Sequence, residues 1–500
     1  MLGRVARGIA GFRAASATWT DTLLGPFRTF GWAAFSQFGR QALQLASLIV
    51  LARLLAPQDF GVMSLATVVT GFVSLFRDMG TGAVLIHRQA AGAPLVRTVS
   101  TLNVLLSVAG GLLTAVSAPV IARFFASPIL EPVLQVLAVS LAVAGLGVAP
   151  QAVMEREGRF DRLARIELGG VATGVVTGIA MAYHGWGIWS LVGQTVVATF
   201  MTTVLLTTAS GARPTLRPDS TLLRGIAGYS LNLAGFNVFN YFVRNADNVI
   251  IGKLLGPQEL GYYALAYQIA IGPVRSIGGV VSRVLFPSLA RLQHDRRALR
   301  REYLRAVGLM VSVCLPLMAL LVALAHVGTL ALLGESWMPM VPILVVLGLI
   351  GFVQSASVTI GALYMATGRT DVLMRWGLVT GTLAILAFWI GAQWGALGVA
   401  VAYAVFMVGI TYHCFSIPFR LVGMRVGDVL RISARPAVGS FVTALIAWLI
   451  ARRMEGPAGT MGALISGALG GSLFYLAWYV TGRLSILPKI PASKESGIEG

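Results

Sequence analysis

The sequence predicts an all-α polytopic membrane protein with about fourteen transmembrane helices. We expect two parallel-repeat six-helix lobes around a central cavity, followed by two extra C-terminal helices. Hydrophobic residues make up 56% of the chain and charged residues only 11%, and the mean hydropathy is +0.80. Such values are typical of polytopic membrane proteins rather than soluble domains. The other two observations are a series of apolar segments of membrane-spanning length and one segment that recurs 200 positions later.

The apolar segments define the order of the predicted spans, because a helix needs roughly 20 such residues to cross the hydrocarbon core. They lie near residues 30–54, 60–82, 98–122, 132–152, 167–184, 187–209, 224–254, 260–282, 304–326, 341–366, 373–391, 396–417, 433–451 and 459–480. The loops between them are too short to hold a further folded domain.

Basic residues predict the orientation of these spans. With a cytoplasmic N-terminus, 30 of the 38 Lys and Arg residues fall in inner segments and five in outer ones, so both termini are expected inside. The resulting division is a basic arm (1–29), an N-lobe (30–209, spans 1–6), a linker (210–223), a C-lobe (224–417, spans 7–12), a cytoplasmic loop (418–432), spans 13 and 14 (433–481) and a cytoplasmic tail (482–500). The charged segments 154–167 and 291–305 are expected to form amphipathic helices on the inner face.

The formal charge of +19 does not indicate a nucleic-acid partner, because the basic residues are distributed over eight inner segments rather than collected on one face. Topology and attraction to anionic membrane lipids explain this distribution. The five histidines lie at no metal-ligand spacing, so neither a metal nor a cofactor is expected.

The recurring segment indicates an internal duplication. Residues 52–66 read ARLLAPQDFGVMSLA and residues 252–266 read GKLLGPQELGYYALA, with no gap between the copies. Each copy places a proline where a helix should begin and an acid in its first turn, which together stabilise a sharp helix start. Six predicted spans separate the copies, so both lie on the same side of the membrane and the lobes are parallel repeats.

The helix before each copy carries polar residues at the spacing that lines one helix face. In the first helix these are Gln37, Arg40, Gln41, Gln44 and Ser47, and in the second Asn237, Asn240, Tyr241, Arg244 and Asp247. Asn248 adds to the amide content of the second helix. We expect both polar faces to point inward, toward the cavity.

Charges inside a span are functional candidates, because each costs about 2.5–3.5 kcal/mol on insertion scales. Arg40 lies about 14 residues before its outer turn, roughly 21 Å at helical rise, and Arg244 is comparably deep. Two such cations facing a cavity would favour an anionic ligand. Asp247 either pairs with Arg244 for structural reasons or orients it toward a ligand, or it is a titratable site.

Two further arginines and the aromatic residues of the outer loops have simpler explanations. Arg77 and Arg275 lie near the inner ends of their spans, where snorkelling is the first explanation and ligand contact the second. Tyr262 and Tyr263 lie close to a predicted outer loop, and we expect them to belong to an interfacial aromatic belt without a ligand role.

Three stretches carry a resemblance to a known family. They are SQFGRQALQLASLIVLARLLAPQDFG at 36–61, MEREGRFDRLARIEL at 154–168 and YFVRNADNVIIGKLLGPQELGYYALAYQIAIGPVRSIGGVVSRVLFPSLARLQ at 241–293. The chain resembles the polysaccharide transport (Wzx-type) family of bacterial lipid-linked oligosaccharide flippases. The superfamily of this family, the MOP exporters, also contains the lipid II flippase and multidrug and toxin extrusion antiporters.

The resemblance implies alternating access that moves a polyprenyl-diphosphate-linked oligosaccharide across the bacterial inner membrane, for exopolysaccharide, capsule or lipopolysaccharide synthesis. Lipid-linked oligosaccharide, membrane lipids and polysaccharide polymerase or export machinery would be the partners. A diphosphate suits Arg40 and Arg244, and amides suit sugar hydroxyls.

Two other functions compete: a cation-coupled exporter of small amphipathic compounds, and a membrane enzyme acting on lipid-linked sugars. The scarcity of carboxylates inside the spans counts against the exporter, and the short outer loops count against the enzyme.

Overall fold

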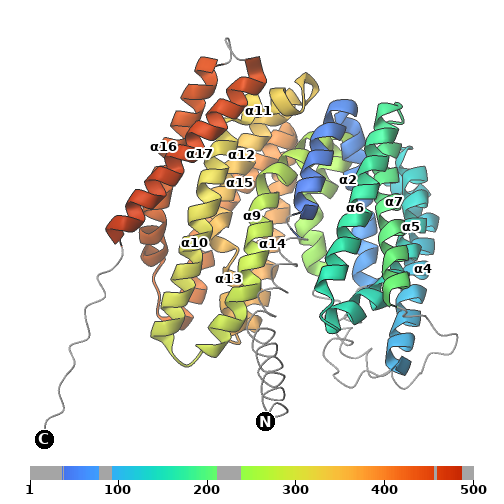
Figure 1. Ribbon diagram of the computed structural model, residues 1–500, viewed down its shortest axis with the longest axis horizontal. Helices are drawn as coiled ribbons and strands as arrows, with labels where there is room; N and C mark the ends of the chain where they lie inside the picture. The colour runs from blue at the N-terminus through green and yellow to red at the C-terminus, as the bar shows by residue number, and fades with distance from the viewer. Residues whose placement is uncertain (1–36, 38, 78–92, 211–237, 455–458, 487–500) are drawn as a thin grey trace, which may run out of the picture. The chain divides into compact units, whose positions relative to one another are not determined.

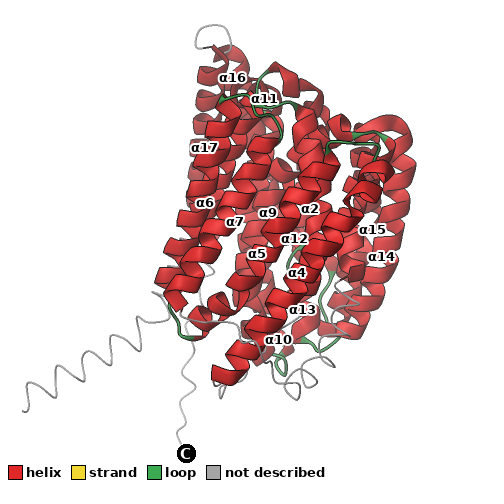
Figure 2. Ribbon diagram, turned by 90° about the vertical axis from the view of Figure 1, so that its right-hand side faces the viewer, coloured by secondary structure: helices red, strands yellow, loops and turns green. Residues whose placement is uncertain are grey.

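The protein is helical throughout the part of the chain that the computed structural model describes. The described residues are 37, 39–77, 93–210, 238–454 and 459–486. Within these ranges the chain forms helices joined by turns, and no strand occurs (Figure 2). The all-α prediction is therefore confirmed.

Each of the predicted spans has a helical counterpart (Figure 1). Helices occupy residues 39–54 and 238–254, and the others are α2 (Pro57–Arg77), α4 (Ala93–Phe124), α5 (Leu130–Arg156), α6 (Phe160–Tyr183), α7 (Trp189–Ser210), α9 (Pro257–Arg291), α10 (Arg296–Ala323), α11 (Ala325–Leu332), α12 (Val341–Ser357), α13 (Ile360–Ala366), α14 (Thr370–Gly391), α15 (Gly395–Val422), α16 (Val426–Met454) and α17 (Gly459–Ile486). Two short 3₁₀ helices, Glu335–Met340 and Ala392–Trp394, precede α12 and α15. Among the described residues, 11 helical segments are long and apolar enough to cross a membrane.

The predicted amphipathic inner-face helices are corrected by the structure. The segment 154–167 is divided by a turn in which Gly158 has φ +70°, and its two parts extend α5 and α6. The segment 291–305 is also divided, by a turn at 292–294. Asp295 follows this turn, and its Oδ1 accepts hydrogen bonds from the backbone N–H groups of Arg297 and Ala298 at 2.9 and 3.0 Å. This N-cap starts α10, so the charged residues after it extend a spanning helix.

The predicted loop 418–432 is also mostly helical, since α15 continues to Val422 and α16 begins at Val426. Asp428 closes the short turn by accepting from the backbone N–H of Arg425 at 3.0 Å. The predicted arm 1–29 and linker 210–223 lie outside the described residues, apart from Ser210 at the end of α7, and so does the tail beyond Ile486.

The chain divides into two compact units. The first comprises Met1–Ala264 and Gly381–Val399, and the second comprises Leu265–Thr380 and Ala400–Gly500. The division thus falls within α9, whereas the sequence places the boundary between the lobes at 210–223. The lobes themselves stay a prediction.

In the first unit, small residues bring helices into close contact. An added Cβ at Gly174 would lie 2.7 Å from the Cβ of Ala198, and one at Gly178 would lie 2.8 Å from the Cβ of Gln194. Both contacts join α6 to α7. Small residues four positions apart allow membrane helices to approach closely, which replaces the hydrophobic driving force that lipid does not supply.

The duplicated turns meet in the same unit. A Cβ added at Gly61 would overlap the backbone carbonyl of Pro257, and one at Gly261 would overlap the backbone carbonyl of Pro57. The contact is reciprocal, since each glycine meets the counterpart of its own neighbouring proline, as expected for two copies related by a two-fold axis. Both α2 and α9 begin at these prolines, which confirms the predicted helix starts.

The second unit has an aromatic and aliphatic core. Tyr303 of α10 and Phe419 of α15 are fully buried and meet edge to face, with ring centroids 5.8 Å apart. The hydroxyl of Thr359 donates a hydrogen bond to that of Tyr303 at 3.3 Å. The two C-terminal helices, α16 and α17, pack against each other and against α10 (Figure 1).

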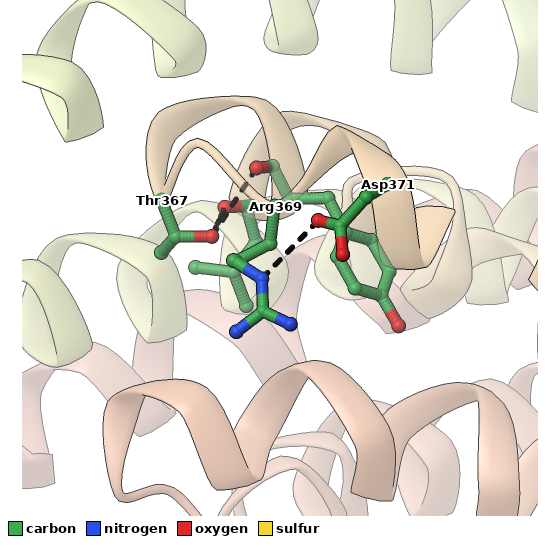
Figure 3. Close-up of polar contacts among 5 residues, drawn as sticks. Thr367, Arg369 and Asp371 are labelled. Atoms are coloured by element: carbon green, nitrogen blue, oxygen red, sulfur yellow. Dashed lines mark hydrogen bonds and ion pairs between the residues drawn. The ribbon is translucent and has the colours of Figure 1, made fainter. Parts of the chain in front are cut away.

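A short turn joins α13 to α14 in this unit (Figure 3). The hydroxyl of Thr367 donates to the backbone carbonyl of Leu363 at 2.9 Å, which satisfies an acceptor at the end of α13. Arg369 then forms an ion pair with Asp371, with Nε and Oδ1 3.2 Å apart, and both side chains are about half exposed.

Candidate functional site

Arg40 lies on the polar face of the helix at residues 39–54, the first helix, and forms an ion pair within the first unit. Arg40 Nη1 lies 3.2 Å from Oε2 of Glu167 on α6, and Arg40 Nη2 donates to Oε1 of Gln37 at 2.9 Å. The side chains of Arg40 and Glu167 are 34% and 17% exposed. The helices approach closely here, because a Cβ added at Gly39 would lie 2.9 Å from Cδ2 of Leu168.

The same helix directs another polar residue to a different neighbour. Ser47 is buried, and its hydroxyl donates to Oε1 of Gln194 on α7 at 3.2 Å. Gln41 is half-buried and Gln44 is exposed. The polar face therefore contacts both α6 and α7, and these helices hold Arg40 and Ser47.

The helix at residues 238–254, the second of the two repeat-related helices, buries its carboxylate, Asp247. Asp247 is only 5% exposed, and its Oδ2 accepts a hydrogen bond from the hydroxyl of Tyr263 on α9 at 3.1 Å. Its Oδ1 accepts from the backbone N–H of Asn248 at 2.8 Å. A buried carboxylate requires such donors, because an ion without compensation is expensive in a low-dielectric interior.

The remaining candidates on the second helix are more accessible. Arg244 is exposed, and Asn240 and Asn248 are half-buried. Tyr241 donates a hydrogen bond to the backbone carbonyl of Val68 on α2 at 2.7 Å, so this polar residue joins two helices. The candidate Asn237 lies outside the described residues.

The two arginines predicted near inner helix ends occupy different units. Arg77 is the last residue of α2. Arg275 is exposed on α9, with its guanidinium carbon 5.4 Å from the ring centre of Tyr267. A cation over an aromatic face is a favourable contact that keeps the arginine accessible at one side.

Sequence reasoning missed two residues of this arrangement, Glu167 and Tyr263. Glu167 stands at the end of a charged segment that was predicted to lie on the membrane surface, yet it is seven residues into α6. Tyr263 was predicted to be an interfacial aromatic residue, but it is fully buried against Asp247. No one-dimensional pattern pairs residues from different helices.

The described residues contain no group of three or more His, Cys, Asp or Glu side chains that could hold a metal ion. What they do contain is a set of charged and amide side chains on two repeat-related helices. Together with the 11 described helical segments that are long and apolar enough to cross a membrane, this set defines a multi-pass membrane protein with polar groups on its spanning helices.

The family is shown by the sequence itself. The chain belongs to the family described as polysaccharide biosynthesis protein, whose model matches residues 50–342. Among similar curated proteins is the teichuronic acid biosynthesis protein TuaB of Bacillus subtilis, 28% identical over 75% of this chain and 79% of TuaB. The lipopolysaccharide biosynthesis protein WzxC of Escherichia coli is 25% identical over 74% and 76%, respectively. The succinoglycan biosynthesis transport protein ExoT of Rhizobium meliloti is 24% identical over 93% and 94%.

Solved structures confirm the fold. The lipid II flippase MurJ in an inward closed conformation superimposes with a TM-score of 0.71, over 92% of this chain and 99% of MurJ, at 15% identity. An inward-facing multidrug resistance MATE family transporter of the MOP superfamily gives a TM-score of 0.62, over 79% and 95%, at 16% identity. At these identities the likeness concerns the fold, which this chain shares with both structures.

Proposed function

We propose that this protein is a flippase that moves polyprenyl-diphosphate-linked oligosaccharide repeat units across the bacterial inner membrane by alternating access. The product would supply exopolysaccharide, capsule or lipopolysaccharide synthesis. The observation that carries the proposal is family membership, together with similarity over nearly the whole chain to a protein named for succinoglycan transport. Polymerase and export machinery would receive the translocated units.

The charged residues support a diphosphate ligand. Arg40 and Arg244 lie on the two helices that precede the duplicated turns; the side chain of Arg40 is 34% exposed, and Arg244 is exposed. A guanidinium binds phosphate oxygens through paired N–H donors. Gln37, Gln41, Gln44, Asn237, Asn240 and Asn248 would offer amides to the sugars, with Asp247 orienting Arg244. Arg77 and Arg275 would contact the ligand from the cytoplasmic side.

The orientation that fits this role has both termini in the cytoplasm, as the bias of basic residues predicts. The substrate would then enter from the leaflet in which the lipid-linked unit is made. Transport requires only that loaded and empty carriers both interconvert between inward and outward states.

The test is translocation of fluorescent undecaprenyl-diphosphate oligosaccharide in proteoliposomes. We expect the wild-type protein to move the lipid and both Arg40→Ala and Arg244→Ala to reduce the rate at least tenfold, equivalent to about 1.4 kcal/mol. Arg369→Ala is the matched control, because it removes an arginine from an exposed ion pair in a turn.

A cation-coupled exporter of small amphipathic compounds is the second candidate, and the buried Asp247 is the observation that favours it, because burial makes this carboxylate a candidate ion site. Proteoliposomes that export dyes in response to a cation gradient, but move no lipid-linked glycan, would overturn the flippase proposal. Hydrolysis or extension of the glycan by the purified protein would instead indicate an enzyme.

A further inference from the structure

The ion pair between Arg40 and Glu167 carries a role that the proposed function does not include. Arg40 Nη1 and Glu167 Oε2 are 3.2 Å apart, and the pair joins the first helix to α6. Glu167 lies about 16 residues before the end of α6 at Tyr183, roughly 24 Å along the helix. Arg40 lies at a similar distance from the end of the helix 39–54, so the two charges are at the same depth along their helices.

Arg40 lies inside its predicted span, where a charge alone is unfavourable, and Glu167 is the first residue of the predicted span 167–184. The pair is only partly shielded, since Arg40 keeps 34% of its side-chain exposure and Glu167 keeps 17%. A guanidinium has five N–H donors. Glu167 and Gln37 are held by one terminal nitrogen each, so an incoming diphosphate can first contact the remaining donors of Arg40 and then displace Glu167.

A carboxylate and a phosphate offer a guanidinium the same recognition chemistry, namely oxygen acceptors that match its planar donor edge. Glu167 and an incoming diphosphate would therefore compete for Arg40. While the carrier is empty, Glu167 compensates the charge of Arg40, and while it is loaded, the diphosphate does so.

We propose that Glu167 is a positioning residue that holds Arg40 in the empty carrier. When the substrate binds, its diphosphate replaces Glu167 as the partner of Arg40. The proposal rests on the proposed function for the identity of the anion. For transport, this means that the empty carrier returns with the charge of Arg40 neutralised by Glu167.

The first experiment measures binding of undecaprenyl diphosphate to the purified protein in detergent, with undecaprenol, which lacks phosphate, as the comparison lipid. We expect Glu167→Gln to bind undecaprenyl diphosphate roughly fivefold more tightly than the wild type, because a competing anion is gone. Arg40→Ala should bind at least tenfold more weakly. Equal or weaker binding by Glu167→Gln, or equal binding of both lipids by the wild type, overturns the proposal.

The second experiment separates exchange from a merely structural ion pair. In proteoliposomes, Glu167→Gln should lower both the apparent KM and the maximal rate, since tighter binding accompanies a slower return of the empty carrier. The charge-reversed variant Arg40→Glu with Glu167→Arg should regain thermal stability but not transport, because the guanidinium now projects from α6. Wild-type transport by this variant would overturn the proposal.

Asp371→Asn is the matched control, because it breaks an Arg–carboxylate pair of the same 3.2 Å separation in an exposed turn (Figure 3). It should change neither the binding of undecaprenyl diphosphate nor the KM. The binding assay does not depend on transport, so a wild-type protein that binds the diphosphate lipid without moving it contradicts the proposed function and not the exchange.

Discussion

The contact between the duplicated turns predicts that Gly261→Ala destabilises the protein. An added Cβ at Gly261 would lie 2.7 Å from the carbonyl carbon of Pro57 and would overlap its oxygen. A backbone carbonyl at a helix start cannot rotate away as a side-chain tip can, so the two turns must separate. Overpacking of this kind typically costs about 1–3 kcal/mol.

Gly272→Ala provides the matched control on the same helix. Nothing lies within 4 Å of a Cβ added at Gly272, so this substitution should only gain helix propensity, about 1 kcal/mol. In thermal unfolding of the detergent-solubilised protein, followed by tryptophan fluorescence, Gly261→Ala should therefore unfold about 2–6 °C below Gly272→Ala.

The double variant tests the reciprocal geometry. Once one added Cβ has separated the turns, a second at Gly61 meets less resistance, so Gly61→Ala should lower the Tm less in the Gly261→Ala background than in the wild type. Equal Tm values for Gly261→Ala and Gly272→Ala, or strict additivity of the two turn substitutions, would refute the argument that these backbones are in contact.

Two further substitutions test contacts within each unit. Tyr263→Phe removes a donor from the buried Asp247, which should cost about 1–3 kcal/mol, whereas Tyr412→Phe, at a residue that is 61% exposed, should leave the Tm within a degree or so of the wild type. Equal Tm values for these two variants would show that the hydroxyl is not required. Arg300→Ala breaks the 2.8 Å ion pair with Asp428, whose side chain is only 19% exposed, and should cost about 0.2–1 kcal/mol. This loss should shrink when the Tm is measured in high salt, and a loss independent of salt would argue against a screened pair.

The sequence determined the helical class of the protein by itself. Hydrophobic composition and segment length require helices in lipid, because every backbone N–H and C=O must be satisfied within its own segment. The duplication was readable as well, since the gapless match around Pro57 and Pro257 predicted two equivalent helix starts, and both helices begin at those residues. Helix ends were less predictable, because the charged residues after Asp295 belong to the same helix, α10, as the apolar residues that follow them.

The polar candidates were found from their spacing, but their partners were not. Spacing along a helix identifies a shared face, and it does not indicate which other helix that face meets. Only the tertiary structure pairs Arg40 with Glu167 and Asp247 with Tyr263, since these partners come from different helices, and each pairing depends on how closely the backbones approach. At Gly39 and Gly61 the absence of a side chain permits that approach, and this effect appears only when two helices are packed together.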